Sequence, residues 1–213
     1  PINLWPNAVQ AYHRWIRTSI AENLPYDRFV REMLTASGSN FRVPQVNFYR
    51  AIQGRSPEAI AKVVALTFMG TRTENWQEAR RVGMAAFFRE VGYKRTAEWK
   101  EEIVYFDPSK AEADSAATVP ALFPDGARAD LSGDEDPREV FADWLIAPEN
   151  PWFAPSIVNR IWYWTVGRGI VHEADDFGPN NPPQNPELLS WLSSELVDAG
   201  YDLKPIYRLI LNS

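Results

Sequence analysis

The segment from Pro151 to Val166 constrains the fold more than any other part of the chain. It begins with proline, is apolar or aromatic over most of its length and is followed by Gly167, a pattern typical of one helix. Its apolar side chains occupy most of the helix circumference and include Ile157, Val158, Ile161, Trp162 and Trp164. A helix that is apolar nearly all round must be covered on more than one side. We therefore expect the following helices to cover one side and the N-terminal helices, through Tyr12, Ile16 and Phe29, to cover the other.

Start and stop signals for helices recur along the rest of the chain. Ser56 is a suitable N-cap before an apolar segment that ends at Gly70, and Asp136 with Glu139 forms a capping box. In the first predicted helix, Val9 and Ile20 belong to the expected buried face. The predicted helices cover residues 7–22, 25–36, 57–69, 76–91, 137–147, 151–166, 186–199 and 204–211. The predicted class is mainly α and multi-helical, with one small β-hairpin-like element in the middle.

Two segments in the middle of the chain indicate the β element. Residues 101–108, EEIVYFDP, are rich in β-branched and aromatic residues, and residues 118–123, TVPALF, are the candidate partner strand. The Gly- and Asp-rich segment 125–136, DGARADLSGDED, is typical of a linker. The predicted division is therefore residues 1–124, a linker at 125–136, and residues 137–213. Because each half is short, we expect the two halves to share an interface.

The composition excludes several classes of function. The chain has no cysteine, which excludes disulfides, thiolate metal sites, a cysteine nucleophile and covalent haem attachment. The net charge of −6 gives no sign of the basic surface that a nucleic acid needs, so no nucleic-acid partner is expected. No apolar run reaches the roughly 18 residues of a transmembrane helix, so no membrane span is predicted in this chain.

The order of motifs in the last third of the chain resembles a known family. NPWFAPSIVNRIW, GRG, DDFG, NPELL and RLILNS follow one another as in the C-terminal domain of the planctomycete-type cytochrome-c-associated family. Those proteins are large secreted bacterial proteins with two adjoining domains of unknown function. LWPNAVQAYHRWI, NLPYDRFVREML and AKVVALTFMG are similar to the later part of the family's first domain.

The resemblance implies both a domain assignment and a location. Residues 1–124 correspond to the later part of the first domain, and residues 137–213 to the start of the C-terminal domain. A secreted, periplasmic or cell-surface location follows from the same resemblance. Many members carry a CxxCH haem-type motif where this chain reads TRTENWQEA, without Cys or His. We therefore expect no haem, no other cofactor and no metal, and the family has no established activity to carry over.

The acidic turn after the aromatic helix contains candidate binding residues. His172 lies in GRGIVHEADDFG, with Arg168 before it and Asp175 and Asp176 after it. One histidine with several carboxylates is a conceivable site for a divalent cation. No second histidine stands nearby, so the favoured interpretation is that Asp175 or Asp176 caps a turn and pairs with Arg168.

Arg160 is a charged residue inside the aromatic helix. A buried guanidinium needs a carboxylate or a stacking ring, because an unpaired buried charge is costly. We predict that Arg160 contacts Asp175 or Asp176 and so links the aromatic helix to the acidic turn. The alternative is that Arg160 binds an anionic group of a substrate.

Tryptophans and acidic residues suggest two kinds of carbohydrate chemistry. The chain has nine Trp, and most are expected in the core, but Trp76 and Trp99 lie at the edges of predicted elements and are candidate sugar-stacking platforms. Paired carboxylates are the catalytic groups of glycoside hydrolases. Glu101 and Glu102 are adjacent, however, and a strand would point them to opposite faces.

Two functions therefore stay open. The leading hypothesis is a non-catalytic module of a secreted or cell-surface protein that serves assembly or glycan-related binding, with glycans or other surface proteins as partners. The alternative is a carboxylate-dependent hydrolase that acts on extracellular polysaccharide. A deep pocket with two carboxylates a few ångströms apart favours the hydrolase, and a flat aromatic patch favours binding.

Overall fold

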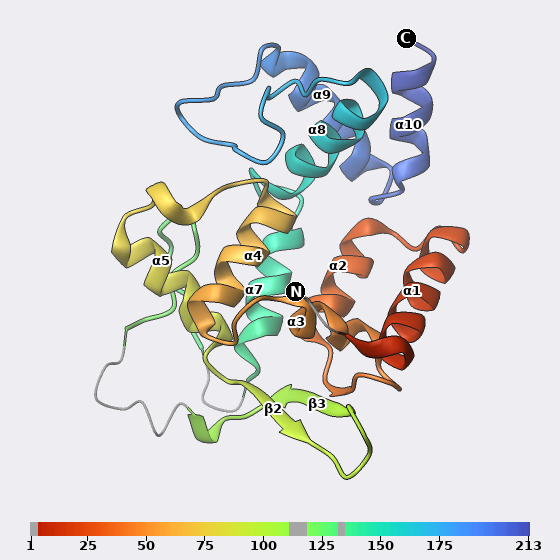
Figure 1. Cartoon of the computed structure of the whole chain (residues 1–213). Helices are drawn as coiled ribbons and strands as arrows, with labels where there is room; N and C mark the ends of the chain where they lie inside the picture. Colours follow the sequence, from red (N-terminus) through yellow and green to blue (C-terminus); the bar gives the residue numbers. More distant parts are fainter. Residues whose placement is uncertain (1–3, 111–118, 132–134) are drawn as a thin grey trace.

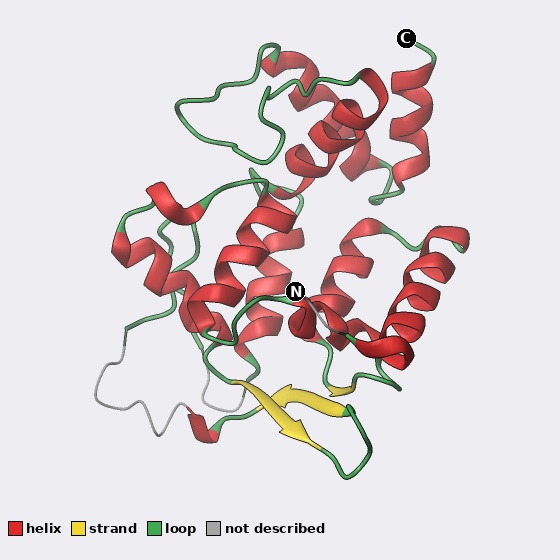
Figure 2. Ribbon diagram, viewed as in Figure 1, coloured by secondary structure: helices red, strands yellow, loops and turns green. Residues whose placement is uncertain are grey.

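The computed structural model describes residues 4–110, 119–131 and 135–213, and these are mainly helical (Figures 1 and 2). This confirms the predicted fold class. The helices of the first half are α1 (Trp5–Ala21), α2 (Tyr26–Thr35), α3 (Asn47–Ala51), α4 (Pro57–Met69) and α5 (Glu78–Ala85), with short 3-10 turns η1 (Pro44–Val46), η2 (Thr73–Asn75) and η3 (Ala86–Phe88). The second half contains α7 (Pro137–Ile146), α8 (Phe153–Val166), α9 (Pro186–Asp198) and α10 (Leu203–Leu211).

A small antiparallel sheet lies at one end of the molecule, at the bottom of Figure 1. Its strands β1 (Gly38–Ser39), β2 (Val91–Arg95) and β3 (Glu102–Phe106) are arranged in the order β1-β3-β2. The predicted strand at 101–108 is thus present, but the predicted partner strand is wrong. Strand β3 pairs with residues 91–95, at the expected end of the fourth helix, and among the described residues it does not pair with 119–123.

Gly92 allows β2 to approach Tyr105 of β3 closely. The sequence pattern makes Gly92 a helix stop, but in the structure it lies in β2 opposite Tyr105. A Cβ at this position would lie 2.7 Å from the Tyr105 ring, so only glycine lets the ring lie across the strand. Of the segment 118–123, residue 118 lies outside the described residues, and Leu122 forms an isolated bridge with Arg128.

The two halves of the chain share one hydrophobic core. Helix α2 packs against α7, and α4 packs against α8. The Tyr26 ring stacks on Phe153 with 5.1 Å between centroids, and the Tyr26 N–H donates to the Tyr201 carbonyl at 3.0 Å. Phe88 meets Phe141 edge-on at 5.4 Å. The expectation that the halves share an interface therefore holds.

The aromatic helix α8 is covered on two sides, but not by the residues expected. Helix α4 and Tyr26 supply the cover from the first half, and α9 and α10 pack on it from the second. Tyr12 and Phe29 instead stack on the two sides of Trp15, within the first half. The last turn of α8 is not covered, since Trp164 is 61% exposed.

The first part of the predicted linker is folded. The Ala129 N–H donates to the Ala121 carbonyl at 3.0 Å, and the Phe123 N–H donates to the Ala127 carbonyl at 2.8 Å. Ala129 is buried, and the Phe123 ring stacks on Trp144 at 5.0 Å. Residues 119–131 therefore form a turn that packs on α7, while residues 132–134 of the linker lie outside the described residues.

Adjacent glutamates at the start of β3 have separate structural partners. Glu102 is buried and binds Arg50 and Arg55 at 3.0 and 2.9 Å, whereas Glu101 accepts hydrogen bonds from Ser39 and Thr96. Burial raises the pKa of the Glu102 carboxyl, but hydrogen bonds from Arg55 and Arg50 outweigh this and leave the pKa below its ordinary value. The prediction that these two acids do not act together agrees with this arrangement.

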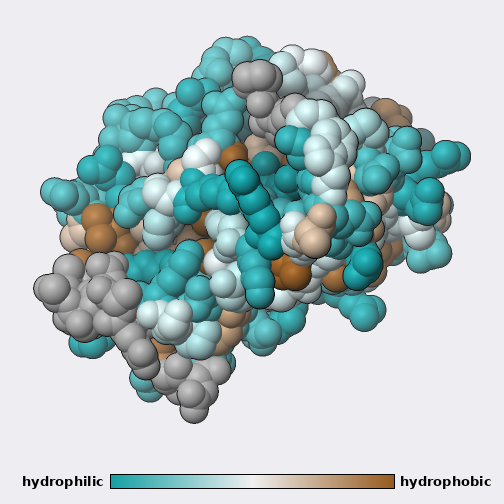
Figure 3. All heavy atoms as spheres, turned by 60° about the horizontal axis from the view of Figure 1, so that its bottom comes forward, coloured by the Kyte–Doolittle hydropathy of each residue, from teal (hydrophilic) through white to brown (hydrophobic). Residues whose placement is uncertain are grey.

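Within the described ranges, none of the helices combines the length and the hydropathy needed to cross a bilayer. The face seen in Figure 3, at the sheet end of the molecule, is mainly hydrophilic with isolated hydrophobic residues between the polar ones.

Candidate functional site

Arg160 links three segments at the junction between α4 and α8. Its Nε donates to Asp175 Oδ1 at 2.7 Å, its Nη2 donates to the Leu66 carbonyl at 2.6 Å, and its Nη1 donates to the Thr67 carbonyl. Leu66 and Thr67 belong to the last turn of α4, where carbonyls have no partner within the helix. The predicted contact with Asp175 is thus present. Its role is structural, because all three edges of the guanidinium are bonded to the protein.

The acidic turn is fixed to the end of α4 by a second set of bonds. Gly70 ends α4 in the left-handed region, with φ of 59°, and its carbonyl accepts from the Phe177 N–H at 2.8 Å. Thr71 Oγ1 returns a bond to the Phe177 carbonyl at 2.9 Å. From α8, Ser156 Oγ donates to the Phe68 carbonyl at 2.7 Å. These bonds hold Phe177 and the neighbouring Asp176 in place.

His172 and Arg168 take no part in this network. Both are exposed, and within the described part of the chain Arg168 pairs with none of the acids of the turn. The interpretation that Arg168 is the partner of Asp175 is therefore wrong, because Asp175 pairs with Arg160. Among the described residues, no group of three or more His, Asp or Glu side chains is placed to hold a metal ion, so His172 has no set of co-ligands there.

A cavity of about 790 Å³ opens beside this turn. Its lining residues include the start of α5 and part of the long loop that joins α8 to α9. These helices are labelled in Figure 1. The wall of the cavity combines aromatic, amide and charged side chains from four separate segments. The polar and aromatic lining residues are Thr71, Arg72, Asn75, Trp76, Gln77, Arg80, Phe123, Asp125, Trp152, Asp176, Phe177, Asn180 and Asn181.

Arg80 stacks on one tryptophan of the cavity and lies farther from the other. Its guanidinium carbon is 3.7 Å from the centre of the Trp76 ring and 5.7 Å from that of Trp152. Its Nε is buried and has no hydrogen-bond partner in the described structure. Burial lowers the pKa of Arg80, and the nearby charge of Asp125 opposes this. The cavity thus contains a stacked guanidinium whose N–H groups are not used by the protein.

The two carboxylates of the cavity, Asp125 and Asp176, differ in how the protein holds them. Asp125 Oδ1 accepts from the Ala127 N–H at 2.8 Å, and Oδ2 accepts from Trp144 Nε1 at 3.2 Å. Both carboxylate oxygens of Asp125 therefore accept hydrogen bonds that stabilise the turn containing this residue. Asp176 is positioned through its backbone, because its carbonyl accepts from Asn181 Nδ2 at 3.1 Å.

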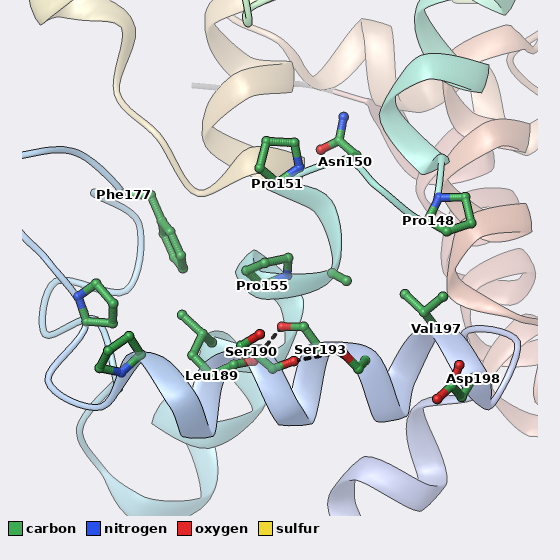
Figure 4. Close-up of a pocket in the computed structure, with 14 residues that line it drawn as sticks. Pro148, Asn150, Pro151, Pro155, Phe177, Leu189, Ser190, Ser193, Val197 and Asp198 are labelled. Carbon is green, nitrogen blue, oxygen red and sulfur yellow. Dashed lines mark hydrogen bonds between the residues drawn. The ribbon is translucent and has the colours of Figure 1, made fainter.

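A second hollow, of about 440 Å³, lies on the other side of Phe177 and is shown in Figure 4. Prolines and Leu189 form much of its wall. Its serines are bonded within α9, since Ser193 Oγ donates to the Leu189 carbonyl and Ser194 Oγ donates to the Ser190 carbonyl. This hollow therefore offers a ligand fewer free polar groups than the cavity that contains Arg80.

Comparison with known proteins gives a family for part of the chain. Residues 137–213 match the family described as PSD1: Protein of unknown function (DUF1553). This part is similar to a domain of unknown function. The match covers less than half of the chain, and it includes Trp152 and Asp176 of the cavity but not Trp76 or Arg80. Neither a search of curated proteins nor a search of solved structures gave a match.

The structure brings together only some of the residues that the sequence indicated. Trp76 and Asp176 line the cavity, whereas Trp99 lies elsewhere, 71% exposed and edge-on to Trp5 at 5.0 Å. The sequence reasoning missed Arg80 and did not single out Trp152 among the tryptophans. Arg80 follows Trp76 by four positions, a spacing that places two side chains on one helix face and that could have indicated the pair.

Proposed function

We propose that this chain is a non-catalytic module that binds glycans in the cavity between α5 and the loop after α8. The observation that carries the proposal is the pair of tryptophans, Trp76 and Trp152, in one polar cavity of about 790 Å³. An indole face covers the C–H groups of a sugar ring, while amides and charged groups bond its hydroxyls. The amides of Asn180, Asn181 and Gln77 line the same cavity.

The wider setting of the proposal comes from sequence likeness. Residues 137–213 match a domain family of unknown function, and the motif order resembles the planctomycete-type cytochrome-c-associated family of secreted proteins. A secreted, periplasmic or cell-surface protein would meet polysaccharides of its surroundings directly. We therefore include this location, and surface glycans or other surface proteins as partners, in the proposal.

Binding accounts for the cavity better than hydrolysis does. Glycoside hydrolysis needs two carboxylates with one of them free to exchange a proton with the substrate and the other free to act on the sugar or a water. The cavity has Asp125 and Asp176, but both oxygens of Asp125 already accept hydrogen bonds from the protein. The hydrolase alternative is therefore the less favoured of the two.

The proposal is tested by measuring glycan binding of Trp76→Ala beside two control variants. The protein is screened against a panel of neutral and acidic polysaccharides, and affinities are then measured by calorimetry. A ring that covers on the order of 80 Å² of apolar ligand surface contributes about 2 kcal/mol. Trp76→Ala should therefore weaken binding roughly 30-fold.

The controls remove tryptophans that lie outside the cavity. Trp99 and Trp164 are 71% and 61% exposed, so Trp99→Ala and Trp164→Ala should bind like the unmodified protein. Loss of binding in Trp99→Ala alone would move the site to the sheet end of the molecule. Absence of binding to the whole panel, or release of new reducing ends on incubation, would refute the proposal.

A further inference from the structure

Arg80 is the cavity residue whose bonding is least complete. The Arg80 guanidinium stacks on the Trp76 ring, and its N–H groups lie in its own plane, where the described protein supplies no acceptor for them. In the described structure the guanidinium makes no hydrogen bond, and its buried Nε has no partner. A buried donor without a partner costs free energy, and a ligand that bonds it removes that cost.

We infer that the glycan unit bound in this cavity carries an anionic group, a carboxylate or a sulfate, and that Arg80 binds this group. The inference rests on the proposed glycan-binding function and names the class of sugar. Two oxygens of either group match the fork of a guanidinium, so both chemistries fit the same residue. A neutral sugar supplies weaker acceptors and places no anionic group against the Arg80 guanidinium.

Other charged groups of the cavity leave room for an anion. Arg72 adds a second positive charge to the wall, and α5 begins at the cavity without a side-chain cap, so the positive end of its dipole adds to that of Arg80. Asp125 and Asp176 oppose this. Asp125 is held by Trp144 and Ala127, and within the described structure neither acid bonds Arg80.

Two other buried arginines have a structural role, and the protein supplies hydrogen-bond partners for the guanidinium of each. Arg138 donates to Asp136, to the Ala36 carbonyl and to Ser37. Arg160 is saturated in the same way by Asp175 and two carbonyls of α4. Arg80 is partly buried but has no such set, which is the arrangement expected of a group whose partner arrives with the ligand.

The test uses two matched pairs of oligosaccharides that differ only in charge. The first pair is oligogalacturonate and its methyl ester, and the second is a sulfated galactan oligosaccharide and its desulfated form. Calorimetry measures the affinity of each for the unmodified protein, for Arg80→Gln and for Arg81→Gln. Arg81 is the next residue of α5, is exposed and does not line the cavity, so its substitution gives the same change in net charge.

The inference predicts that one charged oligosaccharide binds at least about tenfold more tightly than its neutral partner, and that Arg80→Gln lowers its affinity by about 10- to 100-fold. Arg81→Gln should lower it by less than about twofold. The pair that shows the difference identifies the group as carboxylate or sulfate. Circular dichroism confirms that each variant is folded.

Two results would overturn the inference while the glycan-binding function stands. One is equal affinity within both pairs, or binding of neutral glycans only. The other is an equal loss in Arg80→Gln and Arg81→Gln, which would mean that only the overall charge matters. If no glycan of the panel binds, the proposed function and the inference fall together.

Discussion

The junction of α4 with α8 and the cavity beside it are each centred on an arginine, and they differ in what the guanidinium binds. Arg160 at the junction bonds Asp175 and two carbonyls, and its side chain is only 15% exposed. Arg80 in the cavity stacks on Trp76 and bonds nothing in the described structure. The same type of side chain is thus fully hydrogen-bonded by the protein in one region and left without hydrogen-bond partners in the other.

The difference shows how a site can be recognised when no catalytic motif is present. Buried polar groups are normally satisfied, so a saturated arginine is explained by the fold alone. The Arg80 guanidinium lies in a cavity and has no hydrogen-bond partner in the described structure, so the fold alone does not explain it. For Arg160 the contact with Asp175 predicted from the sequence is present, and its guanidinium also donates to two carbonyls of α4.

The largest effect is expected from Arg160→Met, which breaks the junction. The substitution removes an ion pair with Asp175 and leaves the carbonyls of Leu66 and Thr67 without a donor. We expect the free energy of unfolding to fall by about 2–4 kcal/mol and the melting temperature by roughly 5–15 °C. Arg168→Met is the matched control, because Arg168 is exposed and has no ion pair in the described structure. If both variants have the same melting temperature, the bonds of Arg160 do not stabilise the junction.

A somewhat smaller effect is expected at the ion pairs of Glu102, a third place where arginines are saturated. Glu102→Gln should lower the free energy of unfolding by about 2 kcal/mol at pH 7, because Arg50 keeps its charge but loses its counter-charge. The folded pKa of Glu102 lies below 4.5, so its contribution is present above that pH and is lost as the pH falls through the folded pKa.

Urea titrations at several pH values check this prediction. The difference between the unmodified protein and Glu102→Gln should be constant near neutral pH and shrink below about pH 4. Glu98→Gln serves as the control, since its carboxylate is half exposed and lies 4.0 Å from Arg42. A difference that persists unchanged at pH 3 would show that the charge of Glu102 is not what stabilises the protein.

The sequence predicted the elements of the fold better than their contacts. Helix caps and stops at Ser56, Gly70 and Asp136 are local signals, and the helices that they bound are present. The expected inner face of the first helix was wrong at two positions, because Val9 and Ile20 are exposed. Periodicity shows that a helix has an apolar stripe, but the packing partner decides which residues of a broad stripe are covered.

The candidate site was predictable only where its residues are close in sequence. Arg160 and Asp175 are joined by one short connection, and opposite charge was enough to pair them. The cavity depends on Trp76, Arg80 and Trp152, which meet because α4 docks on α8 and the loop after α8 folds back. That long-range packing depends on shape complementarity across the core, which no local pattern encodes.

Gly70→Ala is expected to have an intermediate effect that reaches from the junction to the cavity. A left-handed residue with a Cβ costs roughly 1–2 kcal/mol. The added Cβ would also lie 3.0 Å from Phe177 Cδ2 and 3.2 Å from the Ser156 Cβ, so the Phe177 ring must move. Because Phe177 lines the cavity, glycan affinity should fall along with the melting temperature.

Gly167→Ala separates these two contributions. Gly167 also ends a helix in the left-handed region, with φ of 84°, but no atom lies within 4 Å of the place of its Cβ. It should therefore lose about 1 kcal/mol of stability and keep its glycan affinity. Equal affinities for the two alanine variants would mean that Phe177 does not help to shape the site.

The smallest effect on stability is expected from Arg80→Gln, and this small effect is what the comparison requires. The substitution removes a cation–π contact with Trp76, which contributes about 0.5–1 kcal/mol. It also removes the cost of a buried donor without a partner, which is of similar size and opposite sign. The free energy of unfolding should therefore change by less than about 0.5 kcal/mol, in contrast to Arg160→Met.

A saturating anionic ligand should raise the melting temperature of the unmodified protein, because binding to the folded state stabilises it, and should raise that of Arg80→Gln much less. If Arg80→Gln is instead as unstable as Arg160→Met, then Arg80 has a structural role like that of Arg160, and the two regions do not differ in the role of their arginine.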